Sequence, residues 1–81
     1  MITLSAALQI AHDKEGYIPC TNPEHGYGED VTIDGKTGPA LFVLCPIVQF
    51  YPLPIYLFHS QEDFLESCES YYKQRGGYEV R

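Results

Sequence analysis

Cys20 and His25 are the two side chains whose types and spacing could do chemistry together. Four residues, Thr-Asn-Pro-Glu, separate them within a glycine-rich segment. A thiol beside an imidazole is a nucleophile–base pair, and both groups are also zinc ligands, for which Cys45 or His59 could supply a further donor. No second Cys-x-x-Cys or His-x₃-His spacing and no group to orient the imidazole supports either chemistry. We therefore predict no catalytic residue, no metal ligand and no cofactor, and keep a metal- or thiol-dependent protein using Cys20 and His25 as an alternative.

The other thiols have the pattern of structural residues. Cys45 and Cys68 lie among apolar residues, as core cysteines do. Three cysteines cannot all pair, which favours a reducing compartment. No Lys or Arg precedes Lys14, so the basic start of a signal peptide is missing. We expect a cytoplasmic protein, in a host cytoplasm if the gene belongs to a phage.

Acidic side chains are the other group with a suggestive spacing. Eleven Asp and Glu against five Lys and Arg give a net charge of −6, which disfavours direct binding to nucleic acid and favours a basic protein partner. Glu62, Glu66 and Glu69 fall on one helical stripe, roughly 5–6 Å apart along the axis, a repeat similar to that of phosphates. An ordinary solvated helix face is the alternative. The predicted partner-binding residues are Glu29, Asp30, Asp34, Glu62, Asp63, Glu66, Glu69, Tyr17 and Tyr27.

These features predict a small acidic, non-catalytic protein-binding module. A sharper hypothesis is an inhibitor from a phage or mobile element that mimics nucleic acid and blocks a basic groove on a host nucleic-acid-binding complex. Anti-restriction and anti-CRISPR proteins that mimic DNA have a similar charge and size, although no family motif accompanies that similarity. A homodimeric structural or adaptor protein that pairs through an apolar sheet face is a further alternative.

The uncharged stretch 39–58 decides the fold class. Twenty apolar residues match a membrane-spanning helix, but Pro46, Pro52 and Pro54 would break it, so we predict β-strands and no membrane. Apolar residues at helical spacing and capping residues predict a helix at each end. The expected elements of one domain, residues 1–81, are a helix at 4–15, strands at 31–34, 40–51 and 55–59, and a helix at 61–75.

This order, α-β-β-β-α, predicts an α+β fold with both helices packed on a three-stranded antiparallel sheet. Asp34-Gly35 predicts a hairpin that joins the first strand to the second. Along residues 41–48 both alternating sets of side chains are apolar. The second face of the sheet must therefore be covered by the long loop 16–32, by one of the helices, or by another chain.

Overall fold

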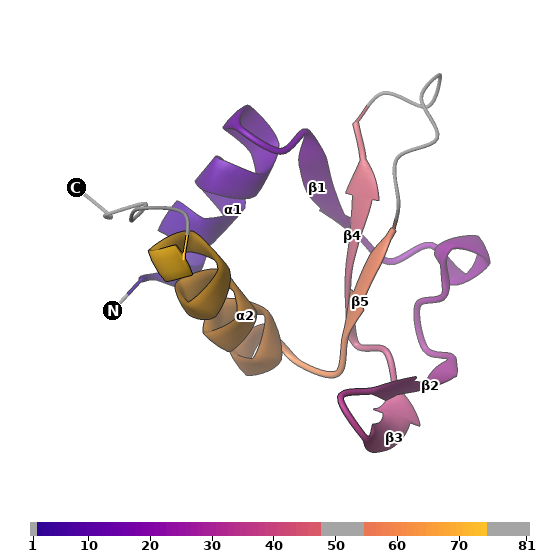
Figure 1. Ribbon diagram of the computed structural model, residues 1–81. Helices are drawn as coiled ribbons and strands as arrows, with labels where there is room; N and C mark the ends of the chain where they lie inside the picture. The colour runs from indigo at the N-terminus through magenta and orange to yellow at the C-terminus, as the bar shows by residue number, and fades with distance from the viewer. Residues whose placement is uncertain (1, 48–54, 75–81) are drawn as a thin grey trace.

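Two α-helices and five strands form the part of the chain that the computed structural model describes, residues 2–47 and 55–74 (Figure 1). Because helices stand at both ends of a run of antiparallel strands, the predicted α+β class is confirmed. No helix in these ranges is long and apolar enough to cross a membrane. In chain order the elements are α1 (Leu4–Asp13), β1 (Tyr17–Cys20), the 3₁₀ helix η1 (Pro23–His25), β2 (Asp30–Ile33), β3 (Lys36–Pro39), β4 (Phe42–Pro46), β5 (Tyr56–Phe58) and α2 (Gln61–Gln74).

A three-stranded antiparallel sheet with the order β1-β4-β5 lies at the centre of the molecule. The prediction that residues 31–34 would supply one of its strands is wrong, because β1 takes that place and β2 pairs with β3 in a separate sheet. The sequence of β1, Tyr-Ile-Pro-Cys, is short and contains a proline, so local propensity did not distinguish it from the predicted loop 16–32. Proline is tolerated there because β1 is an edge strand.

The predicted hairpin forms, but its return strand begins earlier than expected. Asp34 and Gly35 adopt φ values of +50° and +81° in a two-residue turn, and Ile33 pairs directly with Lys36. A two-residue turn sets the register at once, so the partner strand starts at Lys36 instead of residue 40. Of the predicted strand 40–51, the structure shows β4, while residues 48–51 lie outside the described ranges.

Capping residues position the two helices as the sequence predicts. The Thr3 hydroxyl accepts a hydrogen bond from the Ala6 amide at 3.2 Å, and the Ser60 hydroxyl accepts one from the Asp63 amide at 3.2 Å. Gly16 has a left-handed φ of +76°, which turns the chain from α1 into β1. Gly76 and Gly77 follow the predicted second helix in the sequence and lie outside the described ranges.

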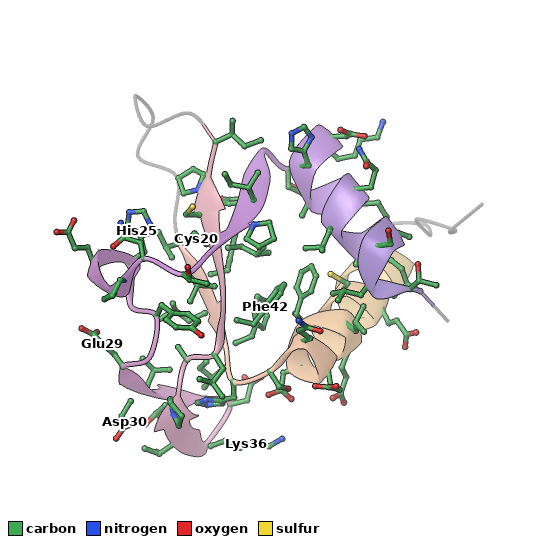
Figure 2. The ribbon with its side chains drawn as sticks, turned by 180° about the vertical axis from the view of Figure 1, so that it is seen from behind. Cys20, His25, Glu29, Asp30, Lys36 and Phe42 are labelled. Atoms are coloured by element: carbon green, nitrogen blue, oxygen red, sulfur yellow. The ribbon has the colours of Figure 1, made fainter. Side chains whose placement is uncertain are left out.

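Both helices cover the same face of the three-stranded sheet (Figure 1). Phe42 points from β4 toward the helices and stacks on Phe64 of α2 with ring centroids 4.9 Å apart (Figure 2). Ala7 and Ala11 bring α1 close to this layer. The buried cluster consists of Ile2, Ala7, Ala11, Tyr17, Phe42, Leu44, Phe64 and Cys68.

Residues between β1 and β2 cover the opposite face. Val43 and Cys45, which alternate with the core residues of β4, are 1% and 7% exposed. η1 lies on this side of the sheet, and a Cβ added to Gly26 would stand 3.2 Å from Cδ2 of Leu57 (Figure 1). Leu57 pairs with Val43 and so shares its face. The long loop thus folds back on the sheet over Val43 and Cys45. Ile18, which pairs with Cys45 on the same face, is still 37% exposed, so the homodimer alternative stays a hypothesis.

Candidate functional site

A groove of about 530 Å³ lies between the β2–β3 hairpin and the exposed side of α2. It brings together three of the predicted partner-binding residues, Asp34, Asp63 and Glu66, although the first is about thirty positions from the others in the sequence. The residues that line it are Ile33, Asp34, Lys36, Phe58, His59, Asp63, Glu66, Ser67 and Ser70.

His59 holds the two walls of the groove together. Its Nδ1 lies 3.1 Å from the Pro39 carbonyl oxygen and its Nε2 lies 3.0 Å from the Lys36 carbonyl oxygen. These contacts join β3 to the connection between β5 and α2, whose next residue, Ser60, caps the helix. Asp34 lines this groove from the hairpin turn, while Asp63 and Glu66 occupy the first two turns of α2.

The charges around the groove favour a cationic ligand. Among the lining residues that the structure describes, three carry carboxylates and one, Lys36, carries a positive charge. A guanidinium or ammonium group entering the groove could form charge-assisted hydrogen bonds with these carboxylates, which are stronger than neutral ones. The apolar floor at Ile33 and Phe58 suits the aliphatic stem of such a side chain.

The other predicted acidic residues do not join this groove. Glu69 accepts a hydrogen bond from the Ile2 amide at 3.1 Å, so it tethers the N-terminal segment to α2. Glu62 is exposed in the first turn of α2. Glu29 and Asp30 lie together at the start of β2, away from the helices (Figure 2). The predicted acidic stripe of α2 therefore does not act as one surface. Glu62 faces solvent, Glu66 lines the groove and Glu69 makes a structural contact.

The two tyrosines proposed as contacts have different surroundings. Tyr17 is 6% exposed and meets Tyr56 edge-to-face with ring centroids 5.1 Å apart. Such burial makes it a core residue, and we leave it out of the proposed surface. Tyr27 is half-buried in the turn that follows η1.

The structure also gathers the thiol and imidazole groups that the sequence singled out. One donor atom from each of Cys20, His25 and Cys45 lies within 4.8 Å of the others, and Cys20 Sγ stands 3.4 Å from His25 Nδ1 (Figure 2). Burial, reinforced by the neighbouring Cys20 thiol, raises the pKa of the Cys45 thiol. Of the two residues considered as a third donor, the fold supplies Cys45, while His59 is engaged at the groove.

The pairing of β1 with β4 explains this arrangement. Cys20 is opposite Val43, and Cys45 is opposite Ile18, so the two thiols are diagonal neighbours on one face of the sheet. Because the two cysteines are 25 positions apart, no local sequence pattern indicated that they would be neighbours. No second hydrogen-bond partner of the His25 ring occurs among residues 2–47 and 55–74, so the orienting group of a thiol nucleophile is not found there.

Comparison with known proteins finds no matching family model, no similar curated protein and no similar solved structure.

Proposed function

We propose that this chain is a non-catalytic binding module that takes a basic segment of a protein partner into the groove between the β2–β3 hairpin and α2. The observation that carries the proposal is the convergence of Asp34, Asp63 and Glu66 on one groove from two separate elements. A net charge of −6 adds long-range attraction for such a partner.

The proposal has a sharper form, in which the partner is a nucleic-acid-binding complex and the chain is its inhibitor, carried by a phage or mobile element. Glu62 and Glu66 lie one helical turn apart on exposed positions of α2, a spacing of about 6 Å that suits cations placed to contact phosphates. The three free thiols fit action in a reducing cytoplasm.

The groove can be tested with a set of charge-neutralising substitutions and a matched control. The groove variant carries Asp34→Asn, Asp63→Asn and Glu66→Gln, and Asn tolerates the left-handed backbone at position 34. The control variant carries Glu24→Gln, Glu29→Gln and Asp30→Asn, three exposed acids outside the groove. Each variant loses three negative charges, so a difference in peptide affinity between them must come from the positions of the charges and not from the net charge.

Binding of a fluorescently labelled arginine-rich peptide would be measured by anisotropy at two salt concentrations. We expect the groove variant to bind at least tenfold more weakly than the wild type, and the control variant to bind within about twofold of it. Equal weakening in both variants would show that only net charge attracts the peptide, and the groove proposal would be wrong.

A second measurement addresses the inhibitor hypothesis. A photo-crosslinking amino acid at Ser70, on the groove wall, would capture the natural partner in cell extract, with the same amino acid at the exposed Ser5 of α1 as control. If the partner binds nucleic acid, a DNA or RNA ligand of that partner should compete with the chain. Simultaneous binding of both would reject mimicry while leaving the groove proposal intact.

A further inference from the structure

The cluster of Cys20, His25 and Cys45 lies outside the acidic groove and has no part in the proposed function. Its three donors come from the last residue of β1, the last residue of η1 and the next-to-last residue of β4. Two thiols and one imidazole form a set of soft and borderline donors that selects a transition metal ion over calcium or magnesium. The fold brings these donors together from three separate segments, as it does in many structural and catalytic metal sites.

We propose that Cys20, His25 and Cys45 bind one zinc ion, with water as the fourth ligand. Zinc–sulfur bonds of about 2.3 Å and zinc–nitrogen bonds of about 2.0–2.1 Å place tetrahedral donor atoms about 3.5–3.8 Å apart. The distance of 3.4 Å between Cys20 Sγ and His25 Nδ1 is close to this value, and all three donors lie within 4.8 Å. A small rotation of side chains would therefore complete the coordination.

The backbone around His25 holds the imidazole in place. The Asn22 side chain accepts a hydrogen bond from the Glu24 amide at 3.0 Å, and the His25 amide donates to the Asn22 carbonyl oxygen at 2.9 Å. Pro23 begins the turn, and Gly26 ends it with a left-handed φ of +97°. This short turn rests on Leu57 of the sheet, so η1 presents His25 to the two thiols as a preformed ligand.

The surroundings suit a metal that keeps one open position. Cys45 is buried, whereas Cys20 and His25 are half-buried, so the cluster opens to solvent on the η1 side. Within residues 2–47 and 55–74 no fourth Cys, His, Asp or Glu joins the cluster. Zinc would replace the two thiol protons of Cys20 and Cys45, which are released to solvent, while His25 coordinates through Nδ1 and keeps its proton on Nε2. The two thiolates then neutralise the charge of the ion.

Cobalt(II) provides a spectroscopic test, because tetrahedral thiolate coordination gives strong visible absorption and a thiolate-to-metal charge-transfer band. The full chain, reduced and freed of metal by a chelator, would be titrated anaerobically with Co²⁺ and then with Zn²⁺. We expect saturation at one equivalent with the tetrahedral signature, loss of that signature when zinc displaces cobalt, and a higher melting temperature with zinc.

Three variants separate this site from other binding. Cys20→Ser and His25→Gln, both at half-buried positions, should each weaken cobalt binding at least tenfold while the far-ultraviolet circular dichroism stays that of the wild type. Cys68→Ser, which changes a thiol in the helix-facing core, should bind as the wild type does. Absence of the tetrahedral spectrum in the wild type, or an unchanged spectrum in Cys20→Ser, would overturn the proposal. Peptide binding by these variants should stay normal, which distinguishes the outcome from that of the groove.

Discussion

The three thiols illustrate how much the environment of a single residue decides. Cys68 lies in the core beneath the helices, where burial raises the pKa of its thiol to about 11. Burial also raises the pKa of Cys45, while Cys20 is only half-buried beside His25. The same chemical group is thus a packing element at position 68 and a candidate ligand at positions 20 and 45.

Cys68 should make folding stability depend on alkaline pH. Its pKa is raised in the folded chain from an ordinary value of 9.0, so its contribution is complete below pH 9 and is lost as pH rises toward about 11. Urea unfolding between pH 8.5 and about 10.5 should therefore show a shallower loss of stability in Cys68→Ala than in the wild type. Ser67→Ala, a neighbouring exposed change, is the control and should keep the wild-type slope. Equal slopes in all three proteins would contradict this assignment.

At the scale of elements, the short helix η1 depends on one glycine more than on another. Gly26 and Gly28 both have left-handed φ values, +97° and +82°. A Cβ at Gly26 would stand 3.2 Å from Cδ2 of Leu57, whereas a Cβ at Gly28 would meet no atom within 4 Å. The first glycine therefore serves both the backbone conformation and the close approach of the turn to the sheet.

Replacement of each glycine by alanine separates these two roles. Gly28→Ala should cost about 1–2 kcal/mol for the left-handed backbone alone. Gly26→Ala should cost about 1 kcal/mol more, because Leu57 must also move. The free energy of unfolding measured in urea checks both values. Equal losses of unfolding free energy in the two variants would mean that the Leu57 side chain moves without cost and that η1 does not pack closely on the sheet.

At the scale of the whole molecule, His59 connects the hairpin to the main body. Its two ring nitrogens contact the carbonyl oxygens of Lys36 and Pro39. Further contacts come from Ala40, which is fully buried: its amide donates to the Glu29 carbonyl oxygen, and its own carbonyl oxygen accepts from the Gly28 amide. Lys36 and His59 both line the groove, so the contact between them connects its two walls.

Loss of this imidazole should loosen the hairpin without unfolding the core. In His59→Ala, amide protons of the β2–β3 ladder should exchange roughly fivefold faster, since the ring N–H donates a hydrogen bond to a hairpin carbonyl oxygen and such a bond is worth about 1 kcal/mol. Exchange in β4 should change little. His12→Ala, which removes an exposed imidazole at the end of α1, is the matched control. Unchanged exchange in the β2–β3 ladder would show that the hairpin is held by other contacts.

Much of the architecture could be predicted from local signals. Thr3 and Ser60 act as helix caps, Asp34-Gly35 forms the hairpin turn, and apolar periodicity predicts both helices. These features depend on residues close in sequence, where backbone preference and hydrogen-bonding groups act directly. The acidic character of the surface likewise follows from composition.

The strand partners could not be predicted in this way. β1 has four residues and a proline, and its stability comes from pairing with β4, which is more than twenty positions away. The prediction that the hairpin strand 31–34 joins the main sheet is wrong, because the tight turn pairs this strand with its neighbour β3. Pairing between distant strands is set by total burial and not by propensity.

By itself, the sequence determined the helices, the turn, the acidic charge and the presence of reactive side chains. Only the tertiary structure decided that Cys45 meets Cys20 and His25, and that Asp34 meets Asp63 and Glu66. For the thiol cluster the reason is register: side chains alternate along a strand, so a shift of one residue between β1 and β4 would turn Cys45 toward the helices. For the groove the reason is the position of the hairpin turn beside α2. The sequence contains the side chains that could donate to a metal, but the pairing of the strands determines which of them lie on the same face of the sheet.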